Sequence, residues 1–490
     1  MQTINDKIKN GLEDIDMENT DRKPSLATAH SSRSHSDSTV SYNHDFRSSL
    51  VTLAIPIALQ NFISALVNSA DIIMLGTVSQ SAISAVSLAG QISFVAMLFY
   101  MGLGIGVGIL IAQYWGKKDM ATIRRVLSIA CMFSVAVSFV FFIISIISPT
   151  SLMRVFTNDA ELIRYGALYQ KRISFSYLAM SLSQMYLSMI KSMEKARWSA
   201  IVGSSSLLLN IVLNALCIFV LFPGIPEMAI LGVATSTVIA RLVELSCCVL
   251  HSIKKGNIRF SLPANDKVQK QLIYDYLRYA SPALANYVVY GGALAASVAI
   301  IGHVNSDMVA ANAVVMVVRN LAIVLCGGIS GGGSILVGKY LGSGDIPSAK
   351  KCGIRIYIYA LVFGILAALT ILLIKPFVLN IADLNVTALA YLDLMLNICA
   401  VYCIGKSLNS TIIGGIFCAG GDAKFGFWCD IIVMWGIIIP LAYLCAFVWH
   451  VPPVLLYISI CSDEFIKIPV AIIRFRQYRW LKNITRDFDY

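Results

Sequence analysis

The chain has 490 residues, of which 57% are hydrophobic and 13% are charged, and its mean hydropathy is +0.75. This is more apolar surface than a single soluble core can bury, so a soluble globular protein is excluded and a polytopic membrane protein is indicated. The formal net charge of +11 does not indicate nucleic-acid binding, because the cations gather in short loops on one side of the apolar runs.

The first 46 residues are polar, rich in Ser and mixed in charge, and they lack the apolar stretch of a signal peptide. We expect 1–46 to be a disordered cytoplasmic tail. Apolar runs of about 20 residues follow, each long enough to span a bilayer. They begin near Leu50, Ser84, Val126, Leu162, Ala200, Ala229, Leu272, Val309, Ile354, Ala388, Phe425 and Pro453. The sequence therefore predicts an all-α protein with twelve transmembrane helices.

The chain contains an internal duplication. GLGIGVGILIAQYWGKKDMATIRR at 102–125 corresponds to GISGGGSILVGKYLGSGDIPSAKK at 328–351, an offset of 351 − 125 = 226 residues, which also pairs Pro56 with Pro282. Two copies of a membrane unit are typical of secondary transporters, whose halves rock around a site between them. The prediction is two six-helix lobes, with an N-lobe at 47–255, a cytoplasmic linker at 256–271, a C-lobe at 272–480 and a cytoplasmic tail at 481–490.

Lys and Arg residues follow the even-numbered helices, as at Lys117 and Lys118 after the second and Lys350 and Lys351 after the eighth. By the positive-inside rule these loops are cytoplasmic, as are both termini. We expect a multi-pass monomer in the cell inner (plasma) membrane. Its expected partner is the lipid bilayer, and we expect no binding to nucleic acid.

Prolines and glycines mark special positions in the spans. Pro56 and Pro282 each remove a backbone hydrogen bond, which predicts a kink in the first and seventh helices, although each proline can instead mark a membrane entry. The glycines of the second and eighth helices stand inside apolar spans with no following GK[ST], so they indicate close helix packing, with a moving hinge as the alternative.

Asp71 is the clearest candidate for a functional residue. A charge inside a bilayer costs about 2.5–3.5 kcal/mol on insertion scales, and no cation on the same span neutralises this carboxylate. Its partner in the second repeat is Ser297, so the acid breaks the symmetry of the duplication. Asn68 lies one helical turn earlier and shares its face.

Further polar residues lie on the fifth and sixth spans. Asn210 and Asn214 are four residues apart, so they share a helix face, and Thr237 adds a hydroxyl. If these helices meet Asp71, their oxygens form a site for a hard cation such as Na⁺, or a proton store at the carboxylate. A structural hydrogen bond between helices is the alternative for each Asn.

The other intramembrane charges have candidate partners. Arg241 and Glu244 are spaced i, i+3 and are expected to pair. Lys406 on the tenth span can hold an anionic group or take the place of a cation, or it can pair with Asp430 or Glu464. No His has metal-ligand spacing and no GxSxG motif occurs, so we expect neither an enzyme nor a cofactor.

Several motifs resemble those of the multidrug and toxic compound extrusion (MATE) family across positions 48 to 480. They are Pro56 with NSADIIMLG, then AQYWGKKD, LNIVLN, GVATSTVIARLVE, IFCAGGDAKF and WGIIIPLAYL. The resemblance implies a coupling-cation site in the N-lobe. Asp71 would be its carboxylate, Asn210 and Asn214 its amide ligands and Thr237 its hydroxyl ligand, and the first helix would bend at Pro56.

The chain departs from the family pattern at two places. Some members have an Asp where Asn214 stands. Other members carry a Glu on the seventh helix and an Asp on the tenth, whereas here 283–297 contains no acid and the tenth helix offers Lys406. Coupling is therefore expected in the N-lobe only.

The function implied is antiport, in which Na⁺ or H⁺ enters and an organic, cationic and amphipathic drug-like compound leaves. Candidate cavity residues are Phe62, Met97, Tyr100, Met101 and Lys406, with packing or lipid contact as the alternative for the apolar ones.

Two other functions remain open from the sequence. One is a flippase for a lipid or a lipid-linked oligosaccharide, which Arg319 and Lys406 would favour by adding positive charge to a central cavity. The other is a membrane receptor or assembly factor without transport activity, which would not need Asp71.

Overall fold

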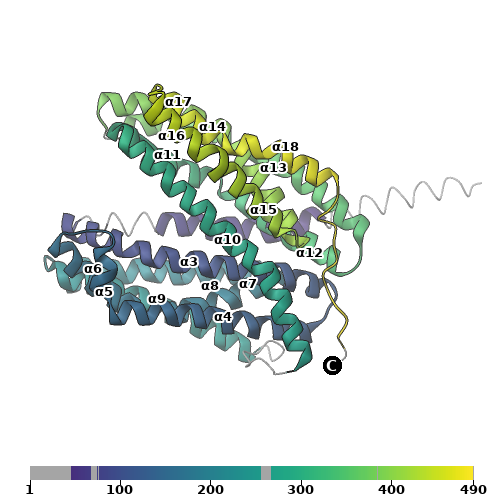
Figure 1. Cartoon of the computed structure of the whole chain (residues 1–490). Coiled ribbons are helices and arrows are strands. Elements are labelled where there is room, and N and C mark those ends of the chain that lie inside the picture. Colours follow the sequence, from purple (N-terminus) through teal and green to yellow (C-terminus); the bar gives the residue numbers. More distant parts are fainter. Residues whose placement is uncertain (1–45, 68–73, 75–76, 255–265, 383, 489–490) are drawn as a thin grey trace, which may run out of the picture. The chain divides into compact units, whose positions relative to one another are not determined.

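The described residues of this computed structural model are 46–67, 74, 77–254, 266–382 and 384–488, and they contain helices and no strand (Figure 1). Residues Leu50–Tyr490 form one unit, separate from Met1–Ser49, and the arrangement below concerns that larger unit. The all-helical fold confirms the predicted class.

The first half contains a helix at Phe46–Val67 followed by α3 (Gln80–Gly116), α4 (Met120–Ile147), α5 (Pro149–Arg154), α6 (Ala160–Ile173), α7 (Phe175–Ser192), α8 (Ala196–Ala215), the π-helical η1 (Leu216–Leu221) and α9 (Pro226–Lys254). The second half contains α10 (Lys267–Val304), α11 (Ser306–Ala322), α12 (Val324–Gly342), α13 (Ile346–Ile381), α14 (Val386–Asn409), η2 (Ser410–Phe417), α15 (Ala423–Asp430), η3 (Ile431–Ile438), α16 (Ile439–Tyr443), η4 (Leu444–Val448), α17 (Pro453–Cys461) and α18 (Asp463–Arg476). Helix α10 begins inside the predicted linker.

Ten helices in the described part are long and apolar enough to cross a membrane. The fourth and twelfth predicted spans are instead divided, into α6 with α7 and α17 with α18. Serine stands at both breaks, where the hydroxyl of Ser174 donates to the Lys171 carbonyl and that of Ser462 to the Ser459 carbonyl. A serine hydroxyl that bonds the carbonyl three residues earlier is therefore a local feature that these two breaks share.

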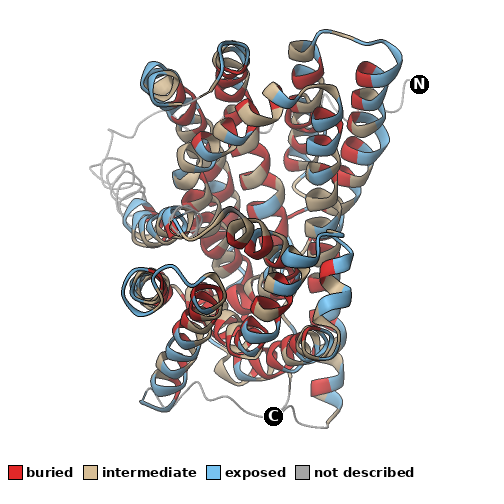
Figure 2. Cartoon of the chain, turned by 90° about the vertical axis from the view of Figure 1, so that its left-hand side faces the viewer, coloured by how far each residue is buried: buried red, intermediate tan, exposed pale blue. Residues whose placement is uncertain are grey.

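The outer surface is apolar, as a lipid environment requires. Figure 2 shows buried positions where neighbouring helices face one another and exposed positions on their outward sides. Leu373, Ile147 and Phe377 are among the most exposed large apolar residues. All twelve cysteines are free thiols; ten of them are buried, and Cys217 and Cys247 are partly exposed.

Small residues hold the two halves together at positions related by the repeat. A Cβ added at Gly106 of α3 would lie 2.5 Å from the Cβ of Ala280 on α10. Gly332 of α12 and Ala54 of the first helix, the repeat mates of that pair, also meet, but less closely: an added Cβ at Gly332 would lie 3.2 Å from the Ala54 nitrogen. Figure 1 shows α10 running beside α3. The glycines therefore serve close packing between lobes.

The same symmetry governs the ends of α3 and α12 that precede the basic loops. A Cβ at Gly116 would overlap the Lys339 carbonyl oxygen, and a Cβ at Gly342 would overlap the Gln113 carbonyl oxygen. Both pairs follow the repeat, since 342 − 116 = 226 and 339 − 113 = 226. Backbone thus touches backbone, and the two lobes are closed together at this end.

Replacing Gly342 by Ala should lower the free energy of unfolding by about 1–3 kcal/mol, the usual cost of an added methyl group that has no room. Thermal unfolding of the purified protein in detergent measures the effect. Gly90→Ala is the matched control, because nothing lies within 4 Å of an added Cβ there. Equal unfolding midpoints for the two variants would contradict the proposed contact.

The segment that follows α18 packs against the helices as far as residue 488, the last one that the structure describes. The side-chain amide of Gln113 donates to the Ala419 carbonyl at 2.8 Å and to the Lys482 carbonyl at 3.1 Å, and its oxygen accepts from the Ile484 N–H. Arg486 donates to both carboxylate oxygens of Asp275, at 2.6 and 2.9 Å. This segment contacts helices of both halves.

Arg486→Ala should loosen this segment, because a bidentate guanidinium–carboxylate pair fixes geometry as well as contributing energy. We expect amide hydrogen exchange at 480–488 to accelerate about tenfold, the result of losing about 1.4 kcal/mol of local stability. Arg479→Ala, a change at an exposed neighbour, is the control. Unchanged exchange in Arg486→Ala would show that the pair does not hold the segment.

Candidate functional site

Helices α8 and α9 form a polar contact in the N-lobe. The side-chain amide of Asn210 donates to the Thr237 hydroxyl at 3.1 Å, and the Ser206 hydroxyl donates to the Ala240 carbonyl at 2.9 Å. Ser206, Asn210 and Asn214 follow one another at four-residue spacing, so they form one buried stripe of α8. The structure therefore brings Asn210 and Thr237 together and places Asn214 on the same face.

Asp71 and Asn68 lie outside the described residues, so the predicted carboxylate of this site remains a prediction. Pro56 lies within the helix Phe46–Val67, 56 − 46 = 10 residues after its start, and Pro282 lies within α10. Both prolines are interior to their helices. The backbone hydrogen bond that each proline removes therefore lies inside a helix.

The buried acidic residue of α9, Glu244, is neutralised locally. Arg241 contacts Glu244 at 2.8 Å, which confirms the pairing expected from their spacing, and the Ser183 hydroxyl also donates to the Glu244 carboxylate. The Glu244 side chain is fully buried, so this pair and its hydrogen bond form a structural unit.

The four apolar candidates for a substrate cavity are dispersed. Tyr100 is buried in the N-lobe core and its hydroxyl accepts a hydrogen bond from Ser138, so the structure assigns it to packing instead. Phe62 and Met101 are exposed, and Met97 is half-buried. Helical periodicity does not distinguish lipid-facing, packed and cavity-lining positions. This explains why Tyr100, expected to line a cavity, is packed in the core.

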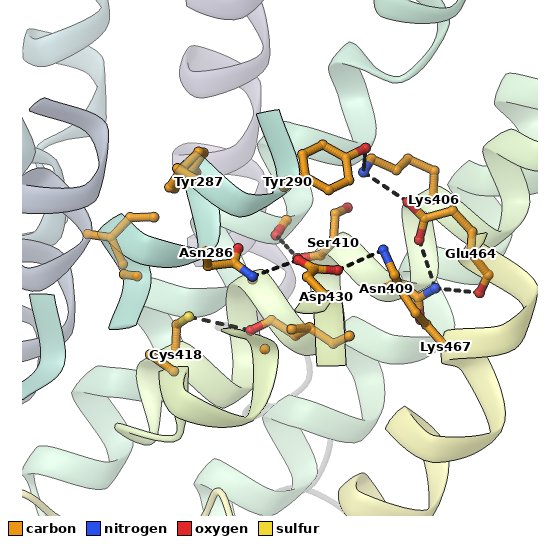
Figure 3. A pocket seen from close by; sticks show the side chains of 17 residues that line it. Asn286, Tyr287, Tyr290, Lys406, Asn409, Ser410, Cys418, Asp430, Glu464 and Lys467 are labelled. Carbon is orange, nitrogen blue, oxygen red and sulfur yellow. Dashed lines mark hydrogen bonds and ion pairs between the residues drawn. The ribbon is translucent and has the colours of Figure 1, made fainter. Parts of the chain in front are cut away.

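The C-lobe contains a cavity of about 280 Å³. Its walls come from α10, the α14–η2 junction, α15 and α18, with single contributions from α3 and α12 (Figure 3). The junction with the π-helical η2 lies in this wall, and the Ser330 hydroxyl donates to the Ser410 carbonyl there. Local departures from α-helical geometry are frequent at functional sites.

Lys406 enters this cavity and is paired. Its ammonium donates to the Tyr290 hydroxyl at 2.6 Å and to a Glu464 carboxylate oxygen at 2.9 Å. The Asn409 side-chain amide donates to the other carboxylate oxygen at 2.8 Å. Of the alternatives that the sequence left open for Lys406, pairing with Glu464 is the one in this structure.

A second cation completes the network. Lys467 contacts Asp430 at 2.7 Å and Asp463 at 3.3 Å. The Asn286 side-chain amide donates to the second oxygen of Asp430 at 2.6 Å. Two lysines thus face three carboxylates, so the network without Arg319 has a formal net charge of 2 − 3 = −1.

Arg319 lies beside this network, with its guanidinium 5.5 Å from the centre of the Tyr402 ring. Arg319 and Asp463 also line a second, smaller cavity of about 50 Å³. Asn286, Tyr290 and Asn409 were not among the residues predicted from the sequence to line a cavity. Asn286 and Tyr290 are spaced i, i+4 on α10, and Lys406 and Asn409 are spaced i, i+3 on α14. Each spacing places a polar pair on one helix face, and this pattern could have revealed them.

The MatE family model matches residues 56–216 and 282–444. The two matches begin 282 − 56 = 226 residues apart, the same offset as the duplicated motifs, so the internal repeat is confirmed.

Curated relatives resemble nearly the whole chain. An uncharacterised transporter, YisQ of Bacillus subtilis, is 24% identical, with 89% of this chain and 95% of the relative covered. A probable multidrug resistance protein NorM of Thermotoga maritima is 23% identical, with 90% and 95% covered. NorM of Photobacterium profundum, named a multidrug resistance protein, is 25% identical, with 82% and 89% covered.

Solved structures share the fold. A multidrug resistance MATE family transporter of the MOP superfamily in an outward-facing conformation superimposes with a TM-score of 0.80 at 17% identity, covering 88% of this chain and 95% of the other. A MOP superfamily transporter from Pyrococcus furiosus, described as having a binding pocket of reverse polarity that suggests a different function, gives 0.79 at 17% identity with the same coverage. These similarities establish the two-lobe architecture.

Proposed function

Since both halves match the family model, this chain belongs to the MATE family of transporters, and we propose that it is a secondary antiporter that exports drug-like organic cations in exchange for Na⁺ or H⁺. Its membership places it among multidrug efflux transporters rather than enzymes. The coupling ion and the compound exported belong to the proposal.

The observation that carries the proposal is the contact between Asn210 on α8 and Thr237 on α9. An amide oxygen and a hydroxyl oxygen at one junction are ligands that suit a hard monovalent cation. Asp71 would supply the negative charge, and Asn68 and Asn214 would add further oxygens. The site would hold Na⁺ through this set, or a proton on the Asp71 carboxylate alone.

Ion occupancy needs a way to change the conformation, and the first helix offers one. Pro56 lies two residues after Ala54, which packs against Gly332 of α12. A bend at Pro56 would shift Ala54 and thereby alter the contact between the lobes. Because ion and compound would then favour different states, binding of one would lower the affinity for the other, as coupled exchange requires.

The positive-inside rule supports a plasma-membrane location with both termini in the cytoplasm. The ends of α3 and α12 that meet at Gly116 and Gly342 would then be cytoplasmic. Closure there supports an outward-facing state in which a compound leaves on the other side. We further propose that the monomer is the transporting unit, since each chain carries both lobes.

A lipid or lipid-linked oligosaccharide flippase is the second candidate. Its anionic cargo would need an excess of positive charge in the cavity, for which Lys406 and Arg319 were the candidates. Lys406 is paired with Glu464, and Arg319 lies against Tyr402. This balance of charge favours a drug antiporter.

Asp71→Asn should abolish ion-driven export while the protein still reaches the membrane, because the amide cannot carry the charge that binds the ion. Efflux of a fluorescent organic cation from proteoliposomes, under Na⁺ and pH gradients imposed separately, measures coupling and identifies the ion. Ion-driven export at the wild-type rate in this variant would remove Asp71 from the mechanism.

Asn210→Ala and Thr237→Ala should each raise the Na⁺ concentration for half-maximal export about tenfold if Na⁺ couples, which corresponds to about 1.4 kcal/mol for a lost ligand. Thr370→Ala is the matched control, because its hydroxyl also donates to the carbonyl four residues earlier, but on an exposed face of α13. An unchanged Na⁺ dependence in both site variants would argue for protons.

A further inference from the structure

The cavity of the C-lobe presents one accessible charge of each sign. The side chain of Lys406 is 23% exposed and that of Asp430 is 12% exposed, whereas Glu464 and Lys467 are only 1% and 3% exposed. A ligand entering the cavity therefore meets the ammonium of Lys406 and the carboxylate of Asp430, while their partners lie behind them.

Both accessible groups have hydrogen-bonding capacity beyond their internal bonds. Lys406 uses two of its three N–H groups on Tyr290 and Glu464 among the described residues. Asp430 accepts one bond on each oxygen, from Lys467 and Asn286, and a carboxylate can accept about four. These bonds also fix each group in place, so neither has to be ordered when a ligand binds.

The remaining lining is suited to an aromatic body. Tyr287 and Tyr290 of α10 lie along one side, and Ile105 and Ile413 add apolar surface. Figure 3 shows the Lys406–Glu464 pair at one edge of the cavity and the Asn286–Asp430 pair nearer its middle. A volume of about 280 Å³ is at the lower end for ligand pockets, which fits a small compound.

The sign of the charges discriminates between ligand classes. The four charged lining groups sum to 2 − 2 = 0, so neither a cation nor an anion gains from the cavity as a whole. A simple cation near Asp430 is repelled by Lys406, and a simple anion near Lys406 is repelled by Glu464 and Asp430. A ligand with both charges can satisfy both groups, and the low dielectric of the membrane interior strengthens each contact.

We propose that this cavity is a binding site for small zwitterionic aromatic compounds, with the anionic group of the ligand on Lys406 and its ammonium on Asp430. The inference rests on the proposed export function and specifies one substrate class for it. Lys406 would then decide whether a carboxylate is accepted, while the ion-coupling residues of the N-lobe would be unchanged.

The test compares two probes that differ only in charge, an aromatic compound bearing a tertiary amine and a carboxylate, and the methyl ester of the same compound. Equilibrium binding to the full-length protein in proteoliposomes is measured for both. We expect wild type to bind the zwitterion about tenfold more tightly than the ester. In Lys406→Gln this preference should disappear, and Lys406→Arg should restore it in part.

Lys406→Gln leaves Glu464 buried without its cation, which can prevent folding. The double variant Lys406→Gln, Glu464→Gln removes both charges and keeps hydrogen-bonding groups, so it provides a second route to the same comparison. Lys375→Gln is the control, because Lys375 pairs with Asp393 and Asn397 away from the cavity. It should retain the wild-type preference.

Equal affinity of the two probes for wild type, or an equal loss of both in the Lys406 variants, would overturn the inference. The outcome for export is separate. If the ester is exported under an ion gradient while the preference for the zwitterion is absent, only this inference fails. If neither these probes nor the fluorescent organic cation is exported under any gradient, the proposed function fails.

Discussion

The close approach of helices across the two lobes is the contact on which the rest of the structure depends. In lipid, apolar surface gives no driving force for helix association, so packing and hydrogen bonds must supply it. Gly106 against Ala280 and Gly332 against Ala54 provide that packing. One pair is the repeat of the other, so both seams between the lobes place a glycine against an alanine of the facing helix.

The polar groups do not follow this symmetry. The α8–α9 junction of the N-lobe carries neutral polar groups, the amide of Asn210 and the hydroxyl of Thr237. The C-lobe instead contains its own cations, since Lys406 and Lys467 are bonded to carboxylates. The duplicated scaffold therefore carries a neutral polar contact at the α8–α9 junction of one half and a network of paired charges at the cavity of the other.

The sequence predicted most of the fold because membrane spans and repeats are properties of local composition and fixed offsets. It predicted the Arg241–Glu244 pair because their spacing alone sets their distance on a helix. It could not choose the partner of Lys406, because Glu464 is 58 residues away and α14 and α18 had first to be packed together. The packing role of Tyr100 could not be predicted for the same reason. An apolar position on a helix faces lipid, protein or a cavity depending on which helices lie beside it.

The bonds of Gln113 to Ala419 and Lys482 have a consequence for biogenesis. Gln113 lies on α3, and its partner Lys482 is translated 369 residues later. Until then the buried amide has to find water or another temporary partner, because an unsatisfied polar group in this position is costly. The amide therefore gains its native partners only after the second half of the chain has been made and has packed against α3, so this contact forms late in folding.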